Sequence, residues 1–412
     1  MQPRTRRTAA IAVLACVAGS AVAGCSTNAN GQVHDNRVTW SMWGGGSADL
    51  AVWQQVINQV RTSTGTTLEL RMAPFANYFT KVGTQMSADN AACIVSMQSL
   101  RIGAFTPGLL PLDDLIAKTG FDIGAFDKSV QQGLTADGKT YAIAYDVGPL
   151  VMLYNKDRFA AAGVAEPKAG WTMDDFTSAA RKLTAGGKYG FVAAPGDVYM
   201  LPMIYSKTGG LPAKDGQLQL TTPAMKRGFA WYSDLVRKEK VAPPLAGVDL
   251  AFATAEFING NAAMAVDGPW DVLSVRDQAK FKVGMAPIPA GPNGSRTLSA
   301  GSGFGISKNC TDPEKAFRAI AAMTSTETLT YLAKQGRALP ARTAAQSAWF
   351  DNVKIDGAEQ TIRAASATAT PLRTTADWAN VSNLLYQFGV GAFNGSSSPQ
   401  QVLQDVQAAG DR

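Results

Sequence analysis

The sequence contains almost no histidine. Its 412 residues include one, His34, which lies in a polar stretch near the N-terminus. Zinc sites with histidine ligands and catalytic triads of serine, histidine and aspartate need histidine at defined positions in the fold. The composition therefore excludes most histidine-dependent hydrolases and metalloenzymes, and we expect neither a metal nor a cofactor.

Long clusters of basic residues are also absent. The formal net charge is +6, but Arg4, Arg6 and Arg7 belong to the first 24 residues, and +3 remains without them. Nucleic-acid-binding domains concentrate lysine and arginine to contact phosphates. A nucleic-acid partner is therefore not expected.

The first 25 residues combine a basic head with an apolar run from Ala9 to Ala23, which is shorter than the about 20 residues of a membrane span. This arrangement is typical of a secretory signal. Cys25 follows small residues at the expected cleavage site, which resembles a bacterial lipobox. We therefore expect a signal peptide at residues 1–24, lipidation of Cys25, and an exported protein anchored by lipid to the outer face of the cytoplasmic membrane.

Cysteine is scarce, with four in the chain. Cys16 lies in the signal and Cys25 at the lipobox, which leaves Cys93 and Cys310 in the mature protein. Outside the cytoplasm this count favours a Cys93–Cys310 disulfide. The alternative is two buried thiols that act as small apolar side chains.

The mature chain of 388 residues exceeds what one hydrophobic core usually serves, so two domains are expected. Residues 25–37 lack an apolar period and predict a tether. Apolar residues then alternate over residues 37–43, follow helical spacing over 50–60, and alternate again over 68–72. This β-α-β order favours a parallel sheet with a helix packed on it. Later helices are predicted to begin at the capping residues Thr172, Thr222 and Asp312.

Several segments, in order, resemble the extracellular solute-binding proteins of bacterial ABC importers, in their maltose-binding-like, carbohydrate-specific group. The resemblance covers nearly all of the mature chain, and no single motif carries it. The segments are Val38–Gly44 (VTWSMWG), Tyr141–Phe159 (YAIAYDVGPLVMLYNKDRF), Gly170–Leu183, Phe257–Trp270 (FINGNAAMAVDGPW), Gly303–Lys308 (GFGISK) and Arg337–Pro340.

The resemblance implies an α/β fold of the class II periplasmic-binding-protein type, with two lobes. Each lobe is expected to hold a mainly parallel sheet flanked by helices, and the ligand to bind in the cleft between them. The N-terminal lobe is expected at residues 38–146 plus 301–338, and the C-terminal lobe at 147–300 plus 339–412. Ligand contact with both lobes would drive hinge closure.

The resemblance, together with the chemistry of sugars, also predicts the ligand-binding residues. Sugars present apolar C–H faces to aromatic rings and hydroxyl groups to amides, carboxylates and guanidinium groups. Trp270, after Asp267, matches a stacking tryptophan, and Trp43 and Trp378 are expected to supply further aromatic surface. The predicted ligand residues are Trp43, Asn77, Tyr78, Gln98, Arg101, Asp146, Asp197, Tyr199, Asp267, Trp270, Arg337 and Trp378.

The implied function is a sugar-binding, non-enzymatic subunit that acts as a monomer and delivers its ligand to ABC permease subunits. One departure from many relatives is Gly44–Gly46, which replaces paired acidic residues in the first loop and offers no charge. An alternative is a binding protein for glycerophosphodiesters or polyol phosphates, favoured if Arg101 and a second cation face the cleft. Another is a cell-envelope glycoside hydrolase, for which Asp113 and Asp114 are candidate carboxylates.

Overall fold

The computed structural model describes residues 33–34, 36–44, 46–245, 251–372, 374–375 and 377–411. The expected signal peptide, the lipidation site Cys25 and most of the expected tether lie outside the described residues. Within these ranges, no helix has the length and apolar character that a membrane span requires.

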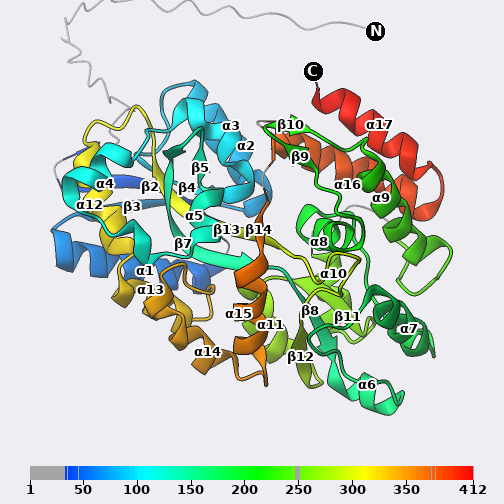
Figure 1. Cartoon of the computed structure of the whole chain (residues 1–412). Coiled ribbons are helices and arrows are strands. Elements are labelled where there is room, and N and C mark those ends of the chain that lie inside the picture. The colour runs from blue at the N-terminus through cyan, green and yellow to red at the C-terminus, as the bar shows by residue number, and fades with distance from the viewer. Residues whose placement is uncertain are drawn as a thin grey trace, which may run out of the picture. The chain divides into compact units, whose positions relative to one another are not determined.

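The first sheet has seven strands, and its central order is β1-β2-β4-β13-β14, with β3 added to β2 and β7 added to β13 (Figure 1). The β-α-β pattern predicted from the sequence is confirmed, because β2 pairs in parallel with β3 across helix α1 (Gly46–Thr64). By contrast, β13 runs antiparallel to both β4 and β7, so the sheet is mixed. The strands are β1 (Val33–His34), β2 (Arg37–Trp43), β3 (Thr67–Ala73), β4 (Ile94–Gln98), β7 (Ala142–Pro149), β13 (Leu298–Ile306) and β14 (Thr370–Pro371).

The second sheet consists of β8 (Val151–Asn155) between β11 (Met264–Asp267) and β12 (Val283–Ala286). Both outer strands run antiparallel to β8, so the prediction of a mainly parallel sheet is wrong here. The two outer strands and helix α11 (Pro269–Gln278) form a β-α-β unit whose strands flank β8. Because β8 arrives directly from the first sheet, it runs in the opposite direction.

Strand β8 contributes to two hydrophobic clusters at once. Met152 and Tyr154 belong to one cluster, and Val151 and Leu153 to the other. This alternation follows from the period of two along a strand, with both faces buried. The second sheet therefore lies between two layers of apolar side chains.

Three chain segments lie side by side where the chain passes between the sheets. Strand β7 leads into β8 through Leu150, whose N–H donates to the carbonyl of Leu298 in β13 (3.0 Å). On its other side, β7 lies against the segment at Leu339. The N–H of Val147 in β7 donates to the carbonyl of Leu339 (3.0 Å). The predicted crossing strand and its neighbours are therefore held together by backbone hydrogen bonds.

The lobe boundaries stay a prediction, since residues 32–412 cluster as one unit. The apolar residues from Leu339 to Ala365 pack with the first cluster, and Leu372 packs with the second.

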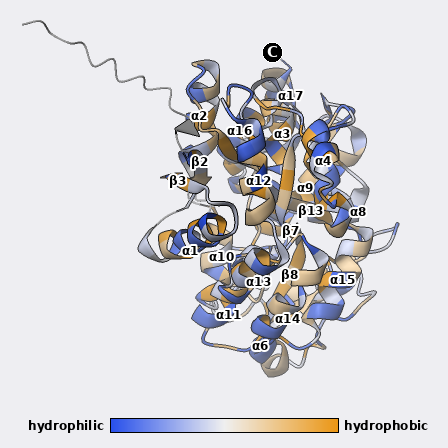
Figure 2. Cartoon of the chain, turned by 90° about the vertical axis from the view of Figure 1, so that its left-hand side faces the viewer, coloured by the Kyte–Doolittle hydropathy of each residue, from blue (hydrophilic) through white to orange (hydrophobic). Residues whose placement is uncertain are grey.

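The helices begin where the sequence predicts them. Thr172 and Asp175 form a capping box at the start of α7, while Thr222 and Asp312 cap α9 and α12. Figure 2 shows hydrophilic segments on α1, α4 and α11, as expected for helices with one face in water.

The remaining helices are α2 (Phe75–Ser87), α3 (Ile102–Phe105), α4 (Asp113–Thr119), α5 (Lys128–Gly133), α6 (Lys156–Ala161), α7 (Met173–Leu183), α8 (Asp197–Thr208), α9 (Pro223–Arg237), α10 (Phe252–Ile258), α12 (Pro313–Met323), α13 (Thr326–Lys334), α14 (Ser347–Val353), α15 (Ala358–Thr368), α16 (Trp378–Asn394) and α17 (Pro399–Gly410). Two short hairpins pair β5 (Thr135–Ala136) with β6 (Lys139–Thr140) and β9 (Ala213–Lys214) with β10 (Gln217–Leu218).

The predicted Cys93–Cys310 disulfide is present. It joins the residue just before β4 to the segment that precedes α12, across 217 residues of sequence. The alternative of two free buried thiols is thereby excluded.

Candidate ligand-binding site

Two of the predicted aromatic residues belong to the core. Tyr78 is 1% exposed, and its hydroxyl lies 3.0 Å from the carbonyl oxygens of Ser41 and Ser96 and accepts from the N–H of Ser96. Burial raises the pKa of Tyr78 well above its ordinary value. Trp43, at the end of β2, is buried with its ring 5.3 Å from that of Tyr78. Both side chains support the sheet edge and lie outside the candidate site.

Arg101 lies directly after β4, as predicted, and is held by three neighbours. Its guanidinium group lies 4.7 Å from the ring of Phe79 and 5.7 Å from that of Phe75, and it donates to Oε1 of Gln98. Phe75 is 39% exposed, although sequence reasoning passed over it in favour of its neighbour Asn77, which is also exposed. Phe75 and Arg101 therefore place an aromatic face beside a cation.

Asp197 begins helix α8 and is fixed by two donors from α16. Its Oδ2 accepts from Nε1 of Trp378 and from Oγ of Ser382, each at 3.1 Å. Trp378 is 0% exposed, so it presents no ring face to a ligand. In place of the predicted aromatic wall, Trp378 is a core residue that positions Asp197.

Tyr386, which the sequence did not single out, lies between these groups. Its hydroxyl would lie 2.2 Å from a Cβ atom at Gly196, which explains why that position is glycine. Asp197, Tyr199 and Arg101 all act electrostatically on Tyr386, and burial raises its pKa. Burial lowers the pKa of Arg101, and Asp197 opposes this effect. The segment after β4 and the start of α8 therefore meet with opposite charges.

Asp267 ends β11 and forms a carboxyl pair with Asp271, one turn further along. Asp267 is 1% exposed and accepts from Oγ1 of Thr254 (3.0 Å) and from the N–H of Gly268 (2.7 Å). Its carboxyl is hydrogen-bonded to that of Asp271. Burial, followed by the neighbouring Asp271, raises the pKa of Asp267 well above its ordinary value. Sequence reasoning missed Asp271, since an aspartate in a first helical turn is equally typical of a helix-dipole contact.

Trp270 lies between these two carboxyl groups in sequence and is partly exposed. Its ring would lie 2.4 Å from a Cβ atom at Gly148 and 2.2 Å from one at Gly268. Two glycines thus let the indole lie against the backbone where β7 ends and α11 begins. Trp270 is the one predicted tryptophan that combines a supported ring with an accessible surface.

Asp146 and Arg337 interact electrostatically beside the crossing strands. Oδ1 of Asp146 accepts from the N–H of Ser302 in β13 at 2.5 Å, at a β-bulge between β7 and β13. Arg337 forms an ion pair with Asp49 (3.5 Å), and its guanidinium lies 5.2 Å from the ring of Trp53. Burial raises the pKa of Asp146 from 3.8 to about 6, and Arg337 partly opposes the shift. Asp49 was not predicted, although it supplies an acidic group close to Gly44.

This shift makes stability depend on pH. The folded-state pKa of Asp146 lies above its unfolded value, so ionising this buried carboxyl lowers the free energy of unfolding. The loss is absent below about pH 4, grows as the pH rises, and reaches about 3 kcal/mol above about pH 6. We expect Asp146→Asn to raise the free energy of unfolding at pH 7.5 by up to this amount and to change it little at pH 4. Urea unfolding of both proteins at the two pH values tests this, and an unchanged or lower stability at pH 7.5 contradicts it.

The structure therefore groups part of the predicted set. Gln98, Arg101, Asp146, Asp197, Tyr199, Asp267, Trp270 and Arg337 are linked by contacts or electrostatic interactions, and Phe75, Asp49, Asp271 and Tyr386 join them. Trp43, Tyr78 and Trp378 are packed behind this group. Within the described ranges, no group of three or more metal-ligating side chains is present.

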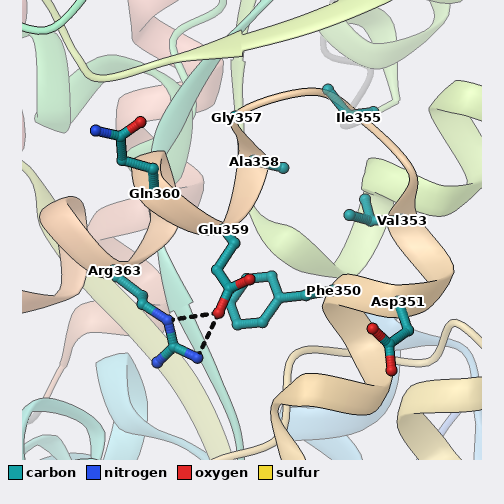
Figure 3. A pocket seen from close by; sticks show the side chains of 9 residues that line it. All are labelled: Phe350, Asp351, Val353, Ile355, Gly357, Ala358, Glu359, Gln360 and Arg363. Atoms are coloured by element: carbon teal, nitrogen blue, oxygen red, sulfur yellow. Dashed lines mark hydrogen bonds and ion pairs between the residues drawn. The ribbon is translucent and has the colours of Figure 1, made fainter.

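Three surface pockets lie elsewhere. One of about 510 Å³ lies between α14 and α15 (Figure 3), where Arg363 stacks 5.0 Å from Phe350 and pairs with Glu359 at 2.7 Å. A groove of about 820 Å³ between α1 and the α12–α13 region is lined mainly by amides and hydroxyls, and a third, of about 480 Å³, lies beside α13 and α14. None of the twelve predicted ligand residues lines any of them.

Comparison with known proteins gives the class of this protein. A family model described as bacterial extracellular solute-binding protein matches residues 55–357. This match covers more than half of the chain, so the chain belongs to the bacterial extracellular solute-binding proteins, a family of exported binding proteins.

Individual relatives are distant. The chain is 27% identical over 264 residues to a binding protein of Brucella abortus, covering 62% of this chain and 64% of that protein, so it spans less than two thirds of that relative. It is 27% identical over 298 residues to the maltodextrin-binding protein MdxE of Bacillus subtilis, covering 68% of each. The solved ABC substrate-binding protein Lmo0181 of Listeria monocytogenes, in complex with cycloalternan, superimposes with a TM-score of 0.80 at 22% identity, covering 91% of this chain and 98% of that one. This last likeness confirms the two-lobed periplasmic-binding-protein fold.

Proposed function

We propose that the protein is the substrate-binding lipoprotein of an ABC importer, which captures a sugar between its lobes and delivers it to the membrane permease without chemical change. Family membership carries the solute-binding part of this proposal. The names of the relatives support the sugar, since one binds maltodextrin and another was solved with cycloalternan. Lipidation at Cys25 would hold the protein at the outer face of the membrane.

The residue types in the candidate site suit a sugar. Arg101 with Gln98, Asp197 with Tyr199, and the part-exposed Trp270 provide guanidinium, amide, carboxylate and aromatic groups from segments far apart in sequence. Aromatic rings pack on the C–H faces of sugars, and charged groups form strong hydrogen bonds to hydroxyls. A ligand that contacts both Arg101, after β4, and Trp270, at the start of α11, would touch both expected lobes and favour closure.

The alternatives receive less support. A glycerophosphodiester site was favoured if a second cation accompanied Arg101. In the described chain the electrostatic neighbours of Arg101 are Asp197 and Tyr386, and the other cation of the candidate site, Arg337, is paired with Asp49. A glycosidase needs two carboxyl groups about 5 Å or more apart to flank the scissile bond. Asp267 and Asp271 are hydrogen-bonded to each other, so they are too close together for this role. The carboxylate of Asp113 accepts a hydrogen bond from the N–H of Thr140 (3.1 Å).

Thermal unfolding with a ligand panel tests the proposal. Monosaccharides, disaccharides, amino sugars, polyols and glycerophosphodiesters would be added to the purified protein, with a chromogenic glycoside assayed separately for hydrolysis. A sugar at 100 times its Kd is expected to add about 2.7 kcal/mol of stability. Stabilisation only by phosphodiesters, hydrolysis of the glycoside, or no stabilisation at all contradicts the proposal.

A further inference from the structure

The hydroxyl of Tyr386 is a buried polar group that the described part of the chain leaves without a hydrogen-bond partner. Tyr386 is 8% exposed, and none of the hydrogen bonds among the described residues includes its hydroxyl. By contrast, the hydroxyl of the fully buried Tyr232 accepts from the N–H of Ala194 (3.2 Å). Buried tyrosine hydroxyls usually have such a partner, because a desolvated polar group without one costs free energy. The partner of Tyr386 is therefore expected to come from outside the chain.

Tyr386 is held in its position because α16 is fixed on both sides of it. One turn before it, Oγ of Ser382 donates to Oδ2 of Asp197 (3.1 Å). One turn after it, Gly389 packs so closely that a Cβ atom there would lie 2.8 Å from Cβ of Pro195. Both contacts join α16 to the segment that begins α8. The hydroxyl is therefore in place before a ligand binds, which reduces the entropy cost of binding.

The hydroxyl lies beside accessible residues of the candidate site. A Cβ atom at Gly196 would lie 2.2 Å from Oη of Tyr386 and 2.8 Å from Cδ2 of Tyr199, so the hydroxyl and the Tyr199 ring are close neighbours. Tyr199 is partly exposed. The turn Ser99–Arg101 also lies against α16, and Arg101 is partly exposed. A molecule that contacts Tyr199 and Arg101 would therefore come within reach of the hydroxyl.

We propose that Tyr386 is a specificity-determining residue, whose hydroxyl forms a hydrogen bond with one hydroxyl of the bound sugar. This inference rests on the proposed function and states how the same site selects among sugars. A tyrosine hydroxyl both donates and accepts, as a sugar hydroxyl does, so the two groups are complementary. A sugar that lacks this hydroxyl leaves Tyr386 without a partner in the bound state, and it therefore binds more weakly.

Isothermal titration calorimetry of the purified protein tests this with a sugar and its monodeoxy analogues. Maltose, cellobiose and diacetylchitobiose are titrated together with the other sugars of the panel described above. The tightest binder becomes the parent sugar of a series in which one hydroxyl at a time is replaced by hydrogen. We expect Tyr386→Phe to bind the parent sugar at least 10-fold more weakly than the wild-type protein does. Among the analogues that the wild-type protein binds more weakly than the parent, the variant is expected to lose the discrimination against one and to retain it against the others.

Stability separates this role from a packing role. Because the hydroxyl of Tyr386 has no partner in the described chain, Tyr386→Phe is expected to leave the urea midpoint of the free protein unchanged or to raise it. Tyr232→Phe is the matched control, since it removes a buried hydroxyl that does have a partner, the N–H of Ala194. We expect this control to lower the urea midpoint while it retains the affinity and every discrimination of the wild type.

Three results overturn the inference and leave the sugar-binding function standing. The first is wild-type affinity of Tyr386→Phe for the parent sugar. The second is a loss of affinity that is equal for the parent sugar and all its analogues, which would assign Tyr386 to packing. The third is a fall in the urea midpoint of Tyr386→Phe as large as that of Tyr232→Phe. If no sugar of the panel binds to the wild-type protein, both proposals are overturned.

Discussion

Replacing Trp270 with alanine is expected to weaken sugar binding by about 100-fold or more, or roughly 2.7 kcal/mol, while the protein stays folded. The indole is partly exposed and packs closely against the backbone at Gly148 and Gly268, so part of its ring is accessible to a sugar. A preorganised aromatic platform loses little conformational entropy on binding, and this makes its removal costly. Calorimetric titration of the variant with the best ligand of the panel measures the loss.

Trp231→Ala is the matched control, because Trp231 is also a partly buried tryptophan. It lies on α9, with Nζ of Lys207 5.4 Å from its ring, and its ring neighbours are Phe176 and Tyr232, which are not in the candidate site. We expect its affinity for sugar to match that of the wild type. Two results would contradict this prediction. One is that Trp270→Ala binds sugar with full affinity, and the other is that it loses about 3–5 kcal/mol of stability, as a truncated core aromatic does. In either case Trp270 is a packing residue and the site lies elsewhere.

The local elements were predictable because their determinants are short-range. The strand at 37–43 and the helix at 173–183 follow from an apolar period and a capping box that a dozen residues contain in full. The direction of β11 and β12 was not predictable in this way. It depends on β8 entering between them from the first sheet, which is a relation between segments more than 100 residues apart.

The candidate site shows the same limit. Arg101, Asp197 and Trp270 were found because each follows a recognisable segment of the family. Whether an aromatic residue lines a ligand site or fills the core depends on its tertiary neighbours, and so Tyr78 and Trp378 were misplaced. Tyr386 lies in the middle of a helix with no local motif. Its role follows only from its approach to Gly196.

Removing the Cys93–Cys310 disulfide is expected to cause a large loss of stability while leaving the candidate site intact. The bond closes a loop of 217 residues, for which the chain-entropy model gives about 5 kcal/mol, against the about 2–4 kcal/mol typical of disulfides. It also ties the start of β4, near the centre of the first sheet, to the segment that leads into α12. We therefore expect reduction to lower the free energy of unfolding by about 3–5 kcal/mol, measured by urea unfolding with and without dithiothreitol.

The double variant Cys93→Ala, Cys310→Ala provides the internal control. Cys93 is 0% exposed, so its truncation also costs packing energy, and the variant alone would not isolate the crosslink. The effect of the reductant separates the contribution of the crosslink from that of packing, because the reductant should lower the stability of the wild type and leave that of the variant unchanged. Equal stability of the wild-type protein with and without reductant would show that the crosslink does not contribute. In that case the first sheet would be held by its core alone.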